Sequence, residues 1–466
     1  MTKIAPILAK ADDNISAGLE RLMQIMRIPS ISTDPDYALD CHCAAEWCLA
    51  MLHDLGFDAR ICQTEGQPIV IGHDLSAGPE SGPHVLFYGH YDVQPAEPLN
   101  LWAHPPFEPC VTNASDGRAR ISGRGASDDK GQFMTFLEAC RAWKDVTGSL
   151  PLRISVLLEG EEEIGGPSML PFLEAHKTEL GADLALICDT EMWDQTTPAI
   201  TTMLRGYLGE EFTLTAANRD LHSGAYGGPA RNPIHVITDL LAKLRDEDGR
   251  ILIPGFYEGV TEPASEMLAS WEALRQSDAE VLSEVGLSSP AGEVGFTAQE
   301  QIWIRPTCEV NGIWGGYTGV GAKTVIPSQA FAKLSFRLVP GQDPHAIRAA
   351  FRTYLTGLIP NDCQIEFTGY DTSKAIEMPI NSDALTRCRQ ALEEEWETPA
   401  VLMPDGTSIP IGGDFKSVLG IDTLFVGFAL ADDNIHSPNE KYDLISFHKG
   451  IRSWVRILAA LQNQPK

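Results

Sequence analysis

The chain has 466 residues, more than one hydrophobic core usually holds, so two domains or one domain with a large insertion are expected. Hydrophobic residues make up 43% of the sequence and charged residues 21%, which is typical of a soluble globular protein. The net charge of −29 argues against binding to nucleic acid or to an anionic membrane surface, because both require clustered Lys and Arg.

The start of the chain and its cysteines bear on where the protein acts. Only a short apolar stretch follows Lys3, too short for a signal peptide. No run approaches the roughly 18 apolar residues of a membrane span. Ten cysteines follow no regular spacing, and Cys48, Cys140 and Cys188 lie inside apolar runs. This usage favours buried thiols in a reducing compartment, so a cytoplasmic protein is predicted.

The first part of the chain alternates predicted helices and strands. Helical spacing of apolar residues predicts helices at Ile15–Ile28, at Ala44–Leu55 before a C-capping Gly56, at Gln132–Trp143 and at Ser168–His176. Short apolar runs predict buried strands at Val85–Tyr88, Ile154–Leu158 and Leu184–Cys188. This alternation predicts the α/β class, with a mainly parallel sheet and helices on both faces.

The middle of the chain has a different pattern. Alternating polar and apolar residues predict strands in 209–220, Ala330–Val339 and Cys363–Gly369. Helices are predicted at Pro233–Leu244 and His345–Gly357, and the acidic stretch Glu258–Glu300 predicts further helix and loop. These elements predict an α+β domain, in which helices cover one face of a small antiparallel sheet.

The end of the chain returns to the first pattern, with a strand at Thr423–Phe428 and an amphipathic helix at Ile445–Leu461. Candidate ligands lie on both sides of the middle region. Residues 206–382 are therefore predicted to be a domain inserted into a catalytic domain made of residues 1–205 and 383–466.

Histidines and carboxylates stand where apolar runs or a glycine-rich turn end. In chain order they are His90, Asp92, Asp128, Asp129, Glu161, Glu162, Glu163, Asp189 and His436. Ligands of open α/β sheets bind beyond the carboxyl ends of the strands, so these side chains are expected to gather there.

Each of these residues alone has a simpler explanation. His90 and Asp92 fit a surface hydrogen bond, Asp128 and Asp189 fit helix or turn caps, and His436 fits a loop histidine. The run of three glutamates fits a solvated acidic turn. Together they match what a dinuclear metal site requires: imidazole and carboxylate ligands for each ion, a bridging group, and a spare carboxylate to accept a proton. A metal-dependent hydrolase is predicted.

The motifs resemble the aminoacylase/carnosinase family of dinuclear zinc metallopeptidases. The resemblance runs from about Val85 to His436, and it is closest to the dipeptidase branch of that family. The phrases that carry it are YGHYDVQPA, GRGASDDKG, LLEGEEEIGG, RDLHSGAYGG, GAKTVIP, FRLVP and IHSPNE.

The resemblance implies a role for each residue. The implied metal ligands are His90, Asp128, Glu163, Asp189 and His436. Asp128 bridges the two ions, with His90 and Asp189 on one and Glu163 and His436 on the other. Glu162 is the general base, Asp92 orients the first histidine, and Glu161 has no role in the chemistry. The Asp128–Asp129 peptide bond is expected to be cis.

The same resemblance makes the inserted domain a lid and dimerisation domain. His222 matches a residue that reaches the active site of the partner subunit, where it stabilises the oxyanion. Arg337 matches a residue that binds the substrate carboxylate, and Thr324 and Ser408 match further substrate contacts.

The overall prediction is a homodimeric, cytoplasmic metallopeptidase that cleaves dipeptides or short peptides with a free C-terminal carboxylate. Two Zn²⁺ ions are the predicted cofactors, with Mn²⁺ or Co²⁺ as alternatives, because His and carboxylate ligands suit several divalent ions. Two other functions stay open: an N-acyl-amino-acid deacylase with the same metal site, and a catalytically silent binding protein on the same fold.

Overall fold

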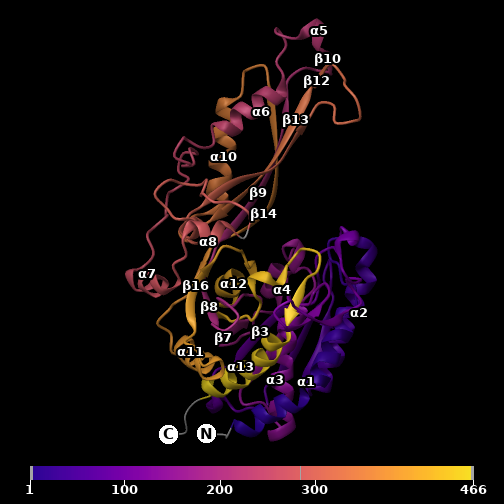
Figure 1. Cartoon of the computed structure of the whole chain (residues 1–466), viewed down its shortest axis with the longest axis vertical. Helices are drawn as coiled ribbons and strands as arrows, with labels where there is room; N and C mark the ends of the chain where they lie inside the picture. The colour runs from indigo at the N-terminus through magenta and orange to yellow at the C-terminus, as the bar shows by residue number, and fades with distance from the viewer. Residues whose placement is uncertain (1–3, 284, 463–466) are drawn as a thin grey trace. The chain divides into compact units, whose positions relative to one another are not determined.

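The computed structural model describes residues 4–283 and 285–462, and it divides the chain into two compact units (Figure 1). Unit 1 consists of Met1–Thr202, Met378–Met403 and Asp414–Lys466, and unit 2 of Met203–Glu377 and Pro404–Gly413. The sequence pattern assigns residues 404–413 to the catalytic domain, but in the structure they belong to unit 2. They are held there because Arg205 Nε donates to the Gly406 carbonyl (2.9 Å) and Ser408 Oγ donates to the Arg205 carbonyl (2.6 Å).

Unit 1 is built on a sheet with the strand order β1-β2-β6-β3-β7-β17-β8. The bounds are β1 Asp58–Cys62, β2 Ile69–Asp74, β3 Val85–His90, β6 Ile154–Glu159, β7 Leu184–Ile187, β8 Ala199–Leu204 and β17 Asp422–Phe425. Strands β6, β3, β7 and β17 are parallel, whereas β1, β2 and β8 pair antiparallel at the two sides. The predicted α/β class is confirmed, and its parallel part is the centre of the sheet.

Helices cover both faces of this sheet. Phe87 of β3 stacks on Phe136 of α3 (Lys130–Thr147) with ring centroids 3.8 Å apart. Tyr88 follows on β3, so it faces the other way, and its ring centroid lies 6.0 Å from that of Phe415. Helices α1 (Ala5–Met26) and α13 (Leu444–Leu461) pack against α3 on the first face, and α4 (Met169–His176) packs beside the short π-helix Phe415–Leu419 on the second.

Helix α1 (Ala5–Met26) begins well before the predicted Ile15. Ile7, Leu8 and Ala11 are buried and extend its apolar face toward the N-terminus. Pro6 lies in the first turn, where the missing N–H leaves no hydrogen bond unmade. The predicted start at Ile15 is therefore wrong, and the helix begins at Ala5.

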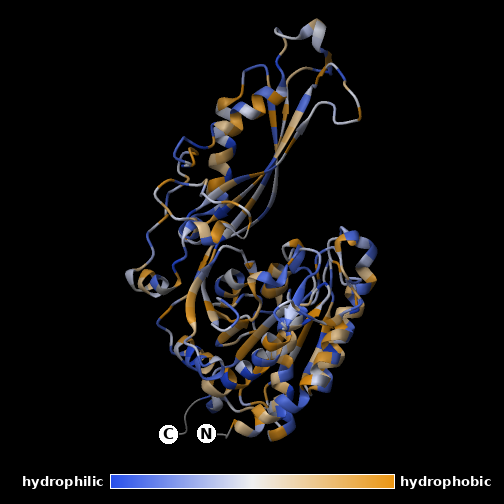
Figure 2. Ribbon diagram, viewed as in Figure 1, coloured by the Kyte–Doolittle hydropathy of each residue, from blue (hydrophilic) through white to orange (hydrophobic). Residues whose placement is uncertain are grey.

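The remaining elements of unit 1 complete its core. They are α2 (Ala38–Asp54), α11 (Asp383–Trp396) and a small antiparallel sheet of β4 (Cys110–Asn113), β5 (Ala119–Ser122) and β18 (Lys441–Asp443). Figure 2 shows hydrophobic residues along the central strands, and helices that are hydrophobic on one side only. Cys48, Cys140 and Cys188 are buried as predicted, and all ten cysteines are free thiols.

Unit 2 contains an antiparallel sheet with the order β11-β13-β9-β14. The bounds are β9 Gly206–Thr215, β11 Thr307–Gly315, β13 Gln329–Leu338 and β14 Gln364–Ser373. Helices α6 (Pro233–Ala242) and α10 (Pro344–Leu358) pack on one face around Phe212, Phe336 and Phe351. This confirms the predicted small antiparallel sheet with helices on one face.

Short elements surround that sheet. Strands β10 (Leu221–His222) and β12 (Val325–Ile326) form a separate ladder, followed by α5 (Ser223–Tyr226). The acidic stretch holds α7 (Ser265–Trp271), α8 (Asp278–Ser283) and α9 (Ala298–Trp303), as the prediction of helix and loop requires. Strands β15 (Ile376–Glu377) and β16 (Val401–Asp405) and helix α12 (Pro410–Asp414) lie where the chain passes between units. Within the described residues, no helix has the length and hydropathy of a membrane span.

Candidate metal centre

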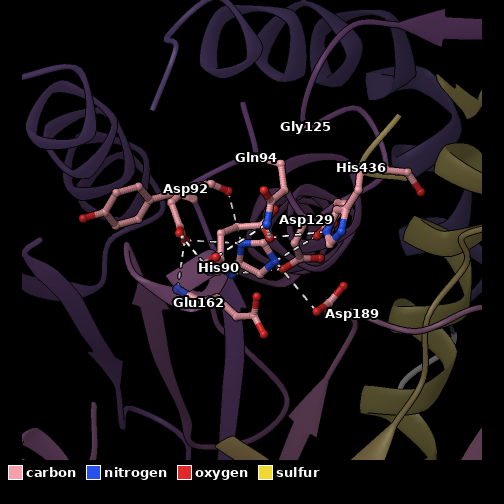
Figure 3. Close-up of polar contacts among 12 residues, drawn as sticks. His90, Asp92, Gln94, Gly125, Asp129, Glu162, Asp189 and His436 are labelled. Atoms are coloured by element: carbon pink, nitrogen blue, oxygen red, sulfur yellow. Dashed lines mark hydrogen bonds and ion pairs between the residues drawn. The ribbon is translucent and has the colours of Figure 1, made fainter. Parts of the chain in front are cut away.

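The parallel strands of unit 1 end side by side. His90 is the last residue of β3 and pairs in register with Glu159, the last residue of β6. Glu162 and Glu163 follow β6 within a few residues, and Asp189 follows β7. His90, Glu162 and Asp189 consequently gather at the carboxyl edge of the sheet (Figure 3), as the sequence predicts.

Two groups of ligand-type side chains share Asp128. The first contains His90, Asp128 and Asp189, with His90 Nε2 3.0 Å from Asp128 Oδ1 and 3.7 Å from Asp189 Oδ2. The second contains Asp128, Glu163 and His436, with His436 Nε2 2.9 Å from Asp128 Oδ2 and 3.3 Å from Glu163 Oε2. Each oxygen of Asp128 therefore faces a different histidine, which is the arrangement of a carboxylate between two ions.

Asp92 orients His90 through its main chain as well as its side chain. His90 Nδ1 lies 3.1 Å from the Asp92 carbonyl oxygen and 3.4 Å from Asp92 Oδ1. The Asp92 carboxylate also accepts hydrogen bonds from the main-chain N–H groups of Glu162 (3.3 Å) and Glu163 (3.1 Å). A single buried aspartate thus holds both the imidazole and the glutamate turn.

Asp128 lies at the end of the glycine-rich turn but does not cap the helix that follows it. Helix α3 begins at Lys130, and no side chain caps its first turn, so the simpler explanation of Asp128 as an N-cap is wrong. The Asp128–Asp129 peptide bond is cis, as the resemblance implies. Asp129 points away from the ligands: its Oδ2 accepts from the His90 main-chain N–H (3.0 Å), and its Oδ1 lies 3.4 Å from Cys188 Sγ.

The three adjacent glutamates have different surroundings. Glu161 is buried, and its carboxylate accepts from the main-chain N–H groups of Gln67 (2.9 Å) and Ser168 (3.1 Å). Glu163 belongs to the second ligand group, whereas Glu162 belongs to neither. Burial, together with the charge of Asp189, raises the pKa of Glu162 well above its usual range. An uncoordinated carboxyl with a raised pKa is suited to accept and return a proton.

Two contacts of the site escaped the sequence reasoning. Asp129 holds the main chain at His90, and Gln94 Nε2 donates to Glu163 Oε2 (2.7 Å) and fixes that carboxylate. Gln94 stands two residues after Asp92 in the same motif, but glutamine is not a metal ligand type and the spacing alone gave no signal. Only the fold places it against Glu163.

The donor set fits two divalent ions. Two imidazoles and three carboxylates are ligands that zinc and related ions accept. Among the described residues, the buried His90 Nε2 has no hydrogen-bond partner of good geometry, although Asp128 Oδ1 lies 3.0 Å away, as expected of two atoms that would bind one metal ion. Burial opposes a charge on His90, but its carboxylate neighbours still raise its pKa well above the usual range. The raised pKa means that the imidazole holds a proton beside these carboxylates, and a metal cation bound there would replace that proton.

Metal uptake by chelator-treated protein is expected to release protons. Asp128 and Glu163 raise the pKa of His436 to about 10, and burial with the Asp128 charge raises that of Asp189 to about 7. The two imidazoles must lose their protons to bind metal, and so must Asp189 in about half of the molecules, so about two to three protons should leave at pH 7, and affinity should fall as the pH falls. Calorimetry of zinc binding in buffers of different ionisation enthalpy measures this number. Binding without proton release would contradict the ligand assignment.

Two of the four candidate residues of unit 2 contact each other, and the other two lie on or beside the β10–β12 ladder. Arg337 Nη1 donates to Ser408 Oγ (2.8 Å), and the guanidinium lies 5.2 Å from the Tyr207 ring centroid. His222 pairs with Val325 across the β10–β12 ladder, and the neighbouring Thr324 carbonyl accepts from the Ser223 N–H (3.0 Å). His222 is exposed, and its Nδ1 accepts from the Gly224 N–H (3.0 Å). These contacts leave the roles of the four residues as predictions.

Comparison with known proteins gives the family. The model described as "Peptidase family M20/M25/M40" matches residues 86–460, most of the chain. The chain belongs to this peptidase family. The family resemblance found in the sequence is thereby confirmed.

Named relatives of this M20 peptidase are dipeptidases. The "Cys-Gly metallodipeptidase" of Candida albicans is 29% identical over 455 residues, which cover 93% of this chain and 92% of the relative. The human "Beta-Ala-His dipeptidase" is 29% identical over 394 residues, 83% of this chain and 76% of the relative. The solved structure of the dipeptidase Dug1p from Saccharomyces cerevisiae superposes with a TM-score of 0.86 at 24% identity, covering 100% of this chain and 99% of that one. This likeness confirms the fold.

Proposed function

We propose that this M20 peptidase is a dinuclear, metal-dependent dipeptidase that hydrolyses dipeptides or short peptides with a free C-terminal carboxylate. The observation that carries the proposal is the pair of ligand groups joined by Asp128, with the uncoordinated Glu162 beside them. His90 and Asp189 would hold one ion, Glu163 and His436 the other, and Asp128 both. Zn²⁺ is the proposed ion, and Mn²⁺ and Co²⁺ share its ligand preferences.

The protein side of the reaction follows from these positions. When bound, two such ions polarise a scissile carbonyl and lower the pKa of water to near neutral. Glu162 accepts the proton of the attacking water and returns it to the leaving amine. Asp92 keeps His90 in one orientation and holds the Glu162 main chain by a hydrogen bond. The general base Glu162 and the metal ligand His90 therefore keep their positions relative to each other.

The substrate class is proposed from the relatives and tested directly. Both curated relatives carry dipeptidase names, Cys-Gly and Beta-Ala-His, which supports dipeptides over acylated amino acids. A panel of dipeptides and N-acetyl amino acids, tested with chelated protein resupplied with zinc or manganese, separates these substrates. Metal-dependent cleavage confined to dipeptides supports the proposal, and preference for N-acetyl amino acids supports the deacylase. Metal binding without turnover of either supports the silent binding protein.

Arg337 is proposed to bind the C-terminal carboxylate of the substrate. Among the residues that the structure describes, no carboxylate forms an ion pair with Arg337, and burial lowers its pKa. Amidation of the dipeptide and the Arg337→Ala change should each lower kcat/KM by about 100-fold, since a charge-assisted pair contributes up to about 3 kcal/mol.

The two changes should not add in that experiment. The amidated dipeptide has no carboxylate for Arg337 to bind. The Arg337→Ala variant should therefore hydrolyse it with a kcat/KM close to that of the wild type on the same substrate. Steady-state kinetics on the four combinations test the assignment. Additive losses would place the carboxylate elsewhere.

His222 is proposed to act in the active site of a partner subunit of a homodimer. Replacement by alanine removes one donor to the developing oxyanion, so His222→Ala should lower kcat by about 100-fold or more. Metal content and sedimentation behaviour should not change. The exposed His345→Ala in the same unit is the matched control and should retain its rate. A monomeric wild type, or full activity of His222→Ala, would contradict this role.

We propose a cytoplasmic location because of the state of the cysteines. Ten free thiols, several of them buried, are typical of proteins kept in a reducing compartment. Burial raises the pKa of Cys48 and of Cys388 to about 12, so these thiols are unreactive.

A further inference from the structure

Glu440 is the residue before β18, and the roles proposed so far do not explain its hydrogen bonds. It is fully buried. Its Oε1 accepts from the main-chain N–H groups of Ser127 (2.9 Å) and Asp128 (3.1 Å). Its Oε2 accepts from the Gly125 N–H (2.9 Å) and from Arg124 Nη1 (2.9 Å). A single carboxylate thus binds four donors of the turn that delivers Asp128.

These bonds join two loops that are distant in the sequence. One is the turn 123–129, which carries Asp128, and the other is the segment 431–440, which carries His436. The Glu440 carbonyl also accepts from the Gly123 N–H (3.0 Å), so main chain and side chain of one residue hold both ends of the turn. A second connection runs from Ser127 Oγ to Asp433 Oδ2 (2.7 Å).

In all of these side-chain contacts the Glu440 carboxyl group is the acceptor. All four partners are N–H donors, and none of them can accept a proton from the carboxyl group. Glutamine has nearly the same shape, but either orientation of its amide sets an NH₂ group against two donors. It would also leave the guanidinium of Arg124, which is 1% exposed, without its countercharge.

The position of Asp128 relative to His436 depends on this connection. The peptide N–H of Asp128 is itself one of the donors to Glu440, and Asp128 Oδ2 lies 2.9 Å from His436 Nε2. We propose that Glu440 is a positioning residue that sets the affinity for the ion shared by Asp128, Glu163 and His436. The inference rests on the proposed metal function, and it assigns to Glu440 a role that acts through the ligands rather than on the substrate.

Zinc titration of metal-stripped protein, in competition with a chromophoric chelator, tests the proposal. Wild-type protein should bind two ions. Glu440→Gln should bind one of them about 10–100-fold more weakly, the usual effect of removing a partner that holds a ligand. Ser127→Ala removes only the second connection between the loops, so it should weaken the same ion less. Glu440→Asp, which keeps the charge, should recover part of the affinity.

Glu395→Gln separates positioning from general stability. Glu395 is a buried carboxylate of unit 1 that pairs with Arg452 (2.6 Å) and Arg456 (2.7 Å), and it belongs to neither ligand group. Its replacement should lower the melting temperature but leave both zinc affinities unchanged. If Glu440→Gln does not fold, Ser127→Ala against this control gives the decisive comparison.

The outcomes are distinct. Wild-type affinities in both Glu440→Gln and Ser127→Ala, or an equal loss of affinity in Glu395→Gln, would overturn the role of Glu440 while the metal function stands. Wild-type protein that binds no zinc would overturn the proposed function and this inference with it.

Discussion

Replacing Glu162 by glutamine should lower kcat by about 10³–10⁴-fold at saturating metal, because the amide cannot accept the proton of the attacking water. Metal content should stay at the wild-type level, since Glu162 belongs to neither ligand group. Burial raises the pKa of Glu162, which suits this carboxylate to accept a proton. Glutamine has nearly the same size, so the substitution removes this function without changing the volume of the side chain. Single-turnover hydrolysis of a dipeptide and metal analysis of the same sample measure the two effects.

The adjacent Glu161 provides the matched control. Its carboxylate accepts two main-chain N–H groups and lies outside the ligand groups. Glu161→Gln should therefore reduce the free energy of unfolding by about 1–2 kcal/mol and leave kcat within a few-fold of wild type. Loss of turnover in Glu161→Gln equal to that in Glu162→Gln would contradict the assignment of Glu162 as the base.

Asp128→Asn is expected to have the second large effect. Each Asp128 oxygen faces a different histidine, and an amide replaces one of these oxygens by an NH₂ group that does not bind metal. At least one of the two ions should be lost, and turnover should fall by about 10³-fold or more at ordinary zinc concentrations, because both ions take part in the reaction. Metal analysis after gel filtration and steady-state kinetics test this.

Asp129→Asn is the control for the same turn. Burial raises the pKa of Asp129 well above its usual range, so the uncharged amide matches the protonation state that the site favours. The amide oxygen can still accept from the His90 N–H, and both ions should be retained. If Asp129→Asn lost as much metal as Asp128→Asn, the bridging role could not be assigned to Asp128 alone.

Local sequence patterns were sufficient for most of the elements. The apolar runs at Val85–Tyr88 and Ile154–Leu158 are β3 and β6, and the helical spacing at Ile445–Leu461 is α13. Burial on both faces makes a central parallel strand a continuous apolar run, so such strands stand out in a sequence. The flanking strands β1 and β2 were missed; no residue of β1 is buried, so its sequence contains no apolar run.

The sequence alone determined which residues could be ligands. His90, Asp189 and His436 each follow an apolar run. Residues that follow buried parallel strands lie at the carboxyl edge of the sheet, where ligands bind. The tertiary structure decided what each carboxylate does. Glu161 and Glu162 are identical in type and adjacent, yet Glu161 accepts from main-chain N–H groups, whereas Glu162, among the described residues, belongs to neither ligand group.

The same limit applies to Glu440 and Gln94, whose partners lie up to 316 residues away in the chain. Strand periodicity and loop position are short-range properties and can be read locally. The direction in which a buried carboxylate turns depends on which unpaired donors the fold brings to it, because a buried polar group must find a partner. Those donors come from segments that meet only when the chain has folded.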